Sequence, residues 1–69
     1  MMQVIYMEDG RDYVKDGVLH KGPNNDTVMV ESDGQQDDLP PYPPTAIAYL
    51  AGGSKKWQMD ASGTWEVFG

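Results

Sequence analysis

The chain has 69 residues, a formal net charge of −6 and a pI near 4.3. A chain this short makes one small domain, and its acidic balance argues against nucleic-acid binding, which depends on Lys and Arg to neutralise phosphates. It has no cysteine and a single histidine, His20, so the sequence predicts neither a disulfide nor a zinc centre. No apolar run approaches the roughly 18 residues of a membrane span, and the start lacks the pattern of a signal peptide. We therefore expect no nucleic-acid partner and no membrane partner.

Residues 3–31 read as an N-terminal β region. Residues 3–7, QVIYM, have the β-branched and aromatic composition of a strand, and the EDGR turn that follows lets residues 12–14 pair back. The phrase YVKDGVLH predicts a tight hairpin around Asp16-Gly17. Residues 27–31, TVMVE, predict a further strand with Val28 and Val30 on one face.

Residues 32–44 form the main break in the chain. Their first part is polar, and four prolines follow, Pro40, Pro41, Pro43 and Pro44, which remove backbone donors and favour extended polyproline II. We interpret the segment as a surface loop or stiff connecting arm, laid along its own chain or along a neighbouring subunit. The alternative is a short ligand for an aromatic-lined groove, as Pro-rich segments are for SH3 or WW domains.

Residues 45–68 predict a three-stranded C-terminal meander. The Gly-containing breaks AGGS and DASG separate three runs whose apolar residues alternate at period two. The same-face pairs are Ile47 with Tyr49, Trp57 with Met59, and Trp65 with Val67. No segment has a helical apolar period, so residues 1–69 are expected to be one small all-β domain, an antiparallel meander of about six short strands with little or no helix.

The polar residues do not form a recognisable catalytic or metal-binding set. Aspartates cluster near glycines, at Asp9, Asp12, Asp16, Asp26, Asp33, Asp37 and Asp38, but no segment matches a calcium-binding loop. Asp is a favoured turn residue because its side chain bonds its own backbone, so turn chemistry and solvation explain these positions better. His20 has no neighbouring nucleophile motif such as G-x-S-x-G. We expect no catalytic residue, no metal site, no cofactor and no enzymatic activity.

Four aromatic residues of the C-terminal region can be interpreted as core residues or as a ligand-binding platform. A large ring buries about 150–250 Å², so in so short a chain the first interpretation is core, with some share in a subunit interface. A platform that stacks on a carbohydrate or other ligand is the alternative. These rings are Tyr49, Trp57, Trp65 and Phe68. The interface candidates are Pro40, Pro41, Tyr42, Pro43, Pro44, Trp57, Trp65 and Phe68.

The run from Leu39 to Val67 resembles a segment of small virion structural proteins of tailed bacteriophages and prophages, including head-fibre-like and other particle-surface proteins. The shared pieces are a proline-containing lead-in, a small-residue strand, a polar turn, an aromatic-Gln strand and a Gly-x-Trp strand. Here they are PPYPPTA, AIAY, AGGSK, KWQMD and SGTWEV. The resemblance implies a β-rich, commonly oligomeric module that is displayed on the particle or attached to it and has no enzymatic role.

These observations lead to one expected function and one alternative. The expected function is a non-enzymatic structural or interaction protein of a phage particle, located in the virion, which binds capsid or tail proteins and forms a homo-oligomer. Capsid decoration or a head fibre would be such a role. The alternative, motivated by the net charge, is a soluble acidic inhibitor or regulator that binds a basic, nucleic-acid-binding protein.

Overall fold

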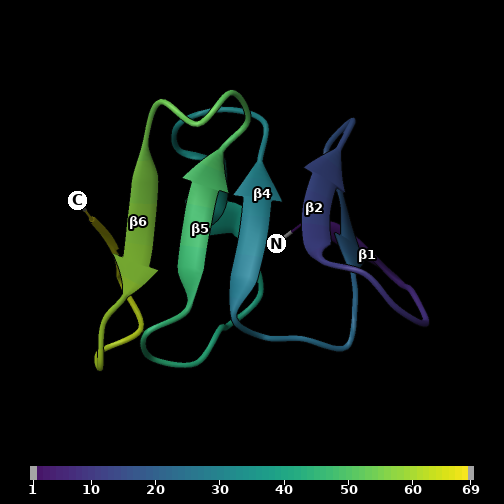
Figure 1. The fold of residues 1–69 in the computed structure, drawn as a ribbon, viewed down its shortest axis with the longest axis horizontal. Helices are drawn as coiled ribbons and strands as arrows, with labels where there is room; N and C mark the ends of the chain where they lie inside the picture. Colours follow the sequence, from purple (N-terminus) through teal and green to yellow (C-terminus); the bar gives the residue numbers. More distant parts are fainter. Residues whose placement is uncertain (1, 69) are drawn as a thin grey trace.

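The computed structural model describes residues 2–68, which form a single seven-stranded sheet (Figure 1). The spatial order of the strands is β1-β3-β2-β4-β5-β6-β7. The only helical element described is a short 3₁₀ turn, η1, so the all-β prediction with little helix is confirmed. Within residues 2–68 no helix is long and apolar enough to cross a bilayer. The elements are β1 (Gln3–Tyr6), β2 (Asp12–Lys15), β3 (Val18–Lys21), β4 (Thr27–Val30), η1 (Gln35–Asp38), β5 (Ile47–Leu50), β6 (Lys56–Met59) and β7 (Trp65–Val67).

The prediction of a purely antiparallel meander of about six strands is wrong, because the sheet has seven strands and is mixed. Strand β1 runs parallel to β3, β2 parallel to β4, and β4 parallel to β5. The last case has a direct cause. The chain between β4 and β5 passes behind the sheet as η1 and the proline-rich stretch, and re-enters at the end where β4 began (Figure 1). Such a crossover produces a parallel neighbour, whereas a tight turn produces an antiparallel one.

The expected pairing of residues 12–14 with residues 3–7 is also wrong. Strand β3 lies between β1 and β2, and the Cα partners of β1 run from Gln3↔Val18 to Tyr6↔Lys21. The β2–β3 hairpin is the more local structure, and β1 pairs with its β3 edge. The EDGR turn therefore connects β1 to a strand that is not its neighbour.

Two local predictions are confirmed. Strands β2 and β3 form the antiparallel hairpin around Asp16-Gly17, where both residues have positive φ, 52° and 78°, as a type I′ turn requires. Strands β5, β6 and β7 form the antiparallel C-terminal meander. Both depend on short turns, whose geometry is set by a few adjacent residues.

The core lies on one face of the sheet, under η1 and the residues that follow it. Trp57 and Met59 of β6 are buried there, and Trp65 of β7 packs against them. The remaining core residues are Val14, Leu19, Val28, Val30, Leu39, Tyr42, Ala46 and Ala48. The prediction that four aromatic rings make the core holds fully only for Trp57, since Tyr49 and Trp65 are half-buried and Phe68 is exposed. Ala46, directly before β5, and Ala48 within it are buried and point inward, which leaves Ile47 and Tyr49 on the opposite face.

The opposite, outer face of the sheet has a continuous row of apolar and ring-containing side chains. Strand register places Ile5 beside His20, His20 beside Tyr13, and Tyr13 beside Met29, and Tyr49 continues the row. The rings of Tyr13 and His20 stack with centroids 4.6 Å apart and an interplanar angle of 10°. The row ends at Lys56, whose Cα partner is Tyr49.

Candidate functional site

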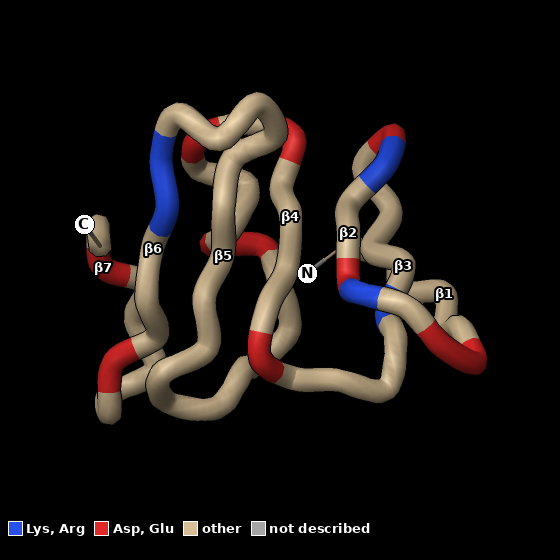
Figure 2. Tube along the Cα trace, in the orientation of Figure 1, with Lys and Arg blue, Asp and Glu red and all other residues tan. Residues whose placement is uncertain are grey.

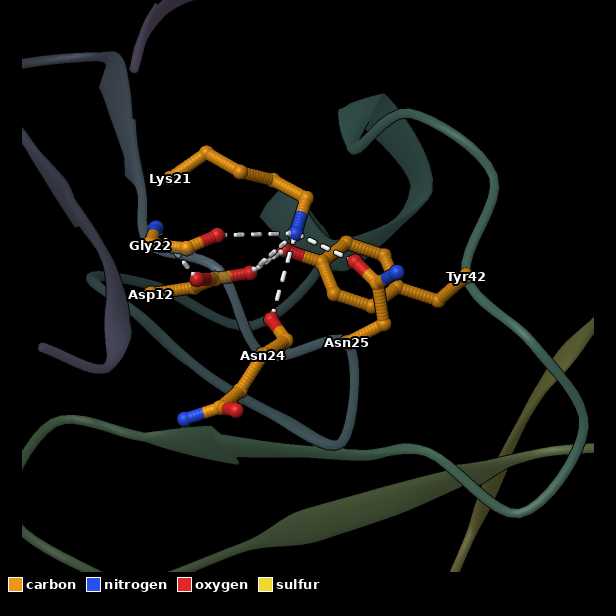
Figure 3. A network of polar contacts seen from close by, with 6 residues as sticks. All are labelled: Asp12, Lys21, Gly22, Asn24, Asn25 and Tyr42. Carbon is orange, nitrogen blue, oxygen red and sulfur yellow. Dashed lines mark hydrogen bonds and ion pairs between the residues drawn. The ribbon is translucent and has the colours of Figure 1, made fainter. Parts of the chain in front are cut away.

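The inner face of the N-terminal strands contains a buried carboxylate, Asp12, which is 1% exposed. Asp12 lies on β2, two residues from the core residue Val14, and alternation therefore points it inward. Its Oδ2 accepts hydrogen bonds from Lys21 Nζ at 3.0 Å and from the hydroxyl of Tyr42. Its Oδ1 accepts a hydrogen bond from the backbone N–H of Gly22 at 2.7 Å. These residues form what we call the buried polar network (Asp12, Lys21, Gly22 and Tyr42; Figure 3).

The ammonium group of Lys21 is surrounded by oxygen atoms. Besides Asp12, it is close to the carbonyl oxygens of Asn24 at 3.2 Å and Gly22 at 3.4 Å, and it donates to Oδ1 of Asn25. It also lies 5.2 Å from the centroid of the Tyr42 ring, within the range of a cation–π contact. The loop after β3 thus wraps the lysine head, so that both charges of the Asp12–Lys21 pair have partners.

Position 22 must be glycine because the backbone of Gly10 lies against it. A Cβ atom at this position would lie 2.1 Å from the carbonyl oxygen of Gly10, which no real side chain tolerates. The turn after β1 and the turn after β3 therefore touch at the end of the polar network. This contact holds the N–H of Gly22 against Asp12.

Tyr42 connects the network to the chain segment that precedes β5. Burial, and then the hydrogen bond and the charge of Asp12, raise the pKa of Tyr42 well above its usual value of 10.0. The phenol therefore stays protonated and acts as a donor. Its hydrogen bond to Asp12 anchors the proline-rich segment to strand β2.

The segment around Tyr42 borders a groove of about 410 Å³ beside β6 and β7. The ring of Trp65 forms part of the wall and lies 5.8 Å from the ring of Tyr42, with the planes tilted by 53°. Leu39 and Met59 add apolar surface, and Asp37 adds a carboxylate. The remaining lining residues are Gln36, Pro40, Pro41, Gly63 and Thr64.

The largest exposed apolar side chains lie at the two edges of the sheet. Ile5 and Tyr6 of β1 are 45% and 80% exposed, and Val67 and Phe68, at the end of β7, are 69% and 41% exposed. Lys56 Nζ lies 5.2 Å from the Phe68 ring centroid, so one of these four carries a charged neighbour. Edge strands present unpaired N–H and C=O groups, which makes them the natural places for an added strand.

The structure separates the predicted interface candidates into distinct environments. Tyr42 and Trp57 are buried within this chain, Pro40 and Trp65 are half-buried beside the groove, and Phe68 is exposed. Pro41, Pro43 and Pro44 are exposed along the same segment. Their participation in an interface stays a prediction.

The acidic residues serve more than one purpose. The carboxylate of Glu31 accepts hydrogen bonds from the side chain of Gln35 and from the backbone N–H groups of Asp16 at 2.8 Å and Gly17 at 3.1 Å. The Gln35 bond, followed by the two backbone bonds, holds the pKa of Glu31 below its usual range. A hydrogen bond from Lys55 likewise lowers the pKa of Asp33. Asp12 departs from the expected turn-and-solvent role altogether. In residues 2–68 no group of three or more His, Cys, Asp and Glu side chains converges as a metal would require.

His20 lies on the outer face, half-buried against Tyr13. Its Nδ1 is a buried atom with no hydrogen-bond partner among the described residues. Ring stacking is the interaction that positions it.

Comparison with known proteins gave no match: no family model, no curated protein and no solved structure is similar to this chain at a significant level.

Proposed function

We propose that this chain is a non-enzymatic structural or interaction protein of a phage particle, which binds capsid or tail proteins through one surface and itself through another. The observation that carries the proposal is the position of the exposed apolar side chains. They lie on the two edge strands, β1 and β7, or directly after β7, where backbone groups are also free to pair. A sheet with two such edges suits assembly into a larger β structure.

The arrangement of residues 39–67, the run that resembles part of small virion structural proteins, gives further support. The pieces AIAY, KWQMD and SGTWEV lie in adjacent strands β5, β6 and β7, and the lead-in PPYPPTA borders the groove beside them. The segment that resembles particle-surface proteins is therefore one continuous antiparallel unit with its own recess. Attachment to a capsid or tail protein through this unit would leave β1 open on the far edge of the sheet.

The polar chemistry of the molecule is directed inward. Asp12, Lys21 and Tyr42 satisfy one another and the loop backbone, so their polar atoms are committed to holding the fold. The network joins three parts of the chain and suits a scaffold that must keep its shape on a particle.

The acidic-inhibitor alternative requires a concentrated negative face to meet a basic partner. Figure 2 shows the Asp and Glu positions spread over turns at both ends of the sheet, over the η1 segment and over strands β2 and β7. This distribution suits solubility, and the inhibitor is kept as an outcome of the test below.

The deciding experiment is peptide mass spectrometry of particles purified from the phage or induced host that encodes the chain. We expect the protein in particles at a copy number comparable to that of other structural proteins. Absence from particles, together with abundance in the infected-cell lysate, would overturn the proposal. A salt-sensitive pull-down of a basic host protein would then support the inhibitor.

A further inference from the structure

The outer edge of β1 differs from an ordinary protected sheet edge. Natural edge strands are commonly guarded by charged residues, proline or a bulge. Residues 2–7, MQVIYM, contain no charged residue and no proline, and Ile5 and Tyr6 are exposed. Among the described residues, the only strand that pairs with β1 is β3.

Backbone direction identifies the free groups on this edge. The N–H of Met7 donates to the carbonyl of Lys21 on β3, and the N–H of Met2 points the other way and donates to the carbonyl of Asp38. Successive residues of a strand direct their backbone groups to opposite edges. Val4 and Tyr6 therefore direct their N–H and C=O groups outward, two residues apart, as an incoming strand requires.

From this geometry we infer that β1 is a self-association edge, where β1 of a second copy adds in antiparallel orientation to make a two-fold symmetric dimer. The inference rests on the self-association included in the proposed function. The outward groups fix the register: Val4 of one copy forms a hydrogen-bonded pair with Tyr6 of the other, and the two-fold axis passes between the two Ile5 residues. This register gives four backbone hydrogen bonds and brings the Ile5 side chains together in a non-hydrogen-bonded pair, where side chains are closest. Each Tyr6 covers the Val4 of the other copy.

The other edge of the sheet shows why β1 is the edge that pairs with itself. On β7 the N–H of Phe68 donates to Lys56 on β6, so Trp65 and Val67 direct their backbone groups outward. Symmetric pairing of β7 would then place Glu66 directly opposite Glu66 of the second copy, and like charges at that position are destabilising. On β1 the equivalent central residue is the uncharged Ile5.

The length of the interface is limited by the start of β1. The N–H of Met2 is already bonded to Asp38, so pairing extends over residues 3–7. Each copy has a net charge of −6, so the two copies repel at long range. We therefore expect added salt to strengthen the dimer by screening this repulsion, opposite to the salt response expected for an acidic inhibitor on a basic partner.

The test uses the full chain in sedimentation velocity over a concentration series. Wild type is expected to form a concentration-dependent dimer. Ile5→Lys places like charges across the axis and should weaken dimerisation at least tenfold, while Val67→Lys, a matched change on the other edge, should dimerise as wild type does. An equimolar mixture of Ile5→Lys and Ile5→Glu should recover a dimer. Circular dichroism of each variant verifies the fold.

A cysteine variant tests the register independently of charge. A non-hydrogen-bonded pair has Cα atoms about 4.5 Å apart, within the range that a disulfide spans. Because the chain has no cysteine, oxidised Ile5→Cys should give a single disulfide-linked dimer, and Gln3→Cys should not.

Several outcomes would overturn the inference: a strictly monomeric wild type, an Ile5→Lys variant that dimerises normally, loss of the dimer in Val67→Lys alone, or failure of Ile5→Cys to cross-link. Chains that lengthen without limit would indicate β1-to-β7 pairing and would equally overturn it. None of these results bears on whether the protein is found in particles. The mass spectrometry test therefore fails or succeeds separately.

Discussion

The N-terminal half of the sheet, β1–β3, and the C-terminal half, β4–β7, are stabilised by different interactions. Strands β4 to β7 contribute most of the apolar core, including Trp57, Met59 and the two buried valines of β4. Strands β1 to β3 contribute only Val14 and Leu19 as fully buried apolar residues, and bury Asp12 as well. Apolar burial supplies most of the stabilising free energy in a small domain, so the N-terminal half depends on the C-terminal half for its stability.

The seam between the halves is short and polar. Strand β2 has two Cα partners on β4, whereas β4 has four on β5. Hydrogen bonds add to this seam: Tyr42 to Asp12, Asp16 and Gly17 to Glu31, and Met2 to Asp38. The C-terminal half, β4–β7, with its aromatic core therefore determines how stable the molecule is, and the polar seam determines how the two halves meet.

The largest loss of stability is expected from a change in the apolar core of the C-terminal half. Trp57 is 2% exposed, and replacement of a buried tryptophan by alanine costs about 3–5 kcal/mol. A chain of this length has a total free energy of unfolding of roughly 3–10 kcal/mol. Trp57→Ala should therefore remove a large share of this free energy and destabilise both halves together, as measured by urea titration with circular dichroism.

The matched control for Trp57→Ala is Phe68→Ala, at an exposed position near the Lys56 side chain. We expect it to change the free energy of unfolding by at most about 0.5 kcal/mol. A Trp57→Ala protein that remains folded with only a small loss would show that the aromatic half does not dominate stability.

Removal of the Asp12 carboxylate should weaken the contact between the two halves of the sheet. Asp12→Ala leaves Lys21 with a half-buried charge and Tyr42 with a buried hydroxyl, and breaking such a pair costs about 3–5 kcal/mol. In hydrogen exchange we expect the amides of β1–β3 to lose protection first, while β5 and β6 keep more of theirs.

The control for Asp12→Ala is a triple variant, Asp12→Leu, Lys21→Met and Tyr42→Phe, which replaces the three polar side chains of the network by apolar groups. It should recover part of the lost free energy, because no buried charge or phenol hydroxyl remains unpaired, although the N–H of Gly22 still loses its acceptor. An Asp12→Ala variant that exchanges uniformly along the chain would contradict the idea of a weak seam.

The parts of the fold that the sequence predicts are the local ones. Asp16-Gly17 supplies the positive φ angles of a tight hairpin, and period-two alternation identifies the strands of the C-terminal meander. The order of strands was not predictable in this way. Insertion of β3 between β1 and β2, and the crossover that makes β4 and β5 parallel, depend on contacts between segments far apart in the chain.

The buried polar network shows both a missed signal and a true limit. The hairpin register places Asp12 opposite Lys21, on the same face as Val14 and Leu19, and this pair could have been read from the sequence. An aspartate near glycines is typical of a turn, and that stronger local pattern hides the buried pair. Tyr42 joins from 30 positions away, and no local pattern indicates that contact.

The smallest predicted effect is a pH dependence of stability that comes from Tyr42 in the seam and not from the apolar core. Because the pKa of Tyr42 is raised in the folded state, its contribution to stability is fully present below the unfolded value near 10 and is lost as pH rises above it. One such group lowers the free energy of unfolding by up to about 1.4 kcal/mol per pH unit in that range.

Tyr42→Phe should cost roughly 1.5–3 kcal/mol at pH 7, because the hydrogen bond to Asp12 is lost. It should then decline less steeply than wild type between pH 10 and 11, so that the two curves converge. Urea titrations at each pH measure this, with Tyr6→Phe at the exposed edge as the control for loss of a phenol. Parallel curves for wild type and Tyr42→Phe would mean that the phenol ionises as easily in the folded chain as in the unfolded one, and that the seam is open to solvent.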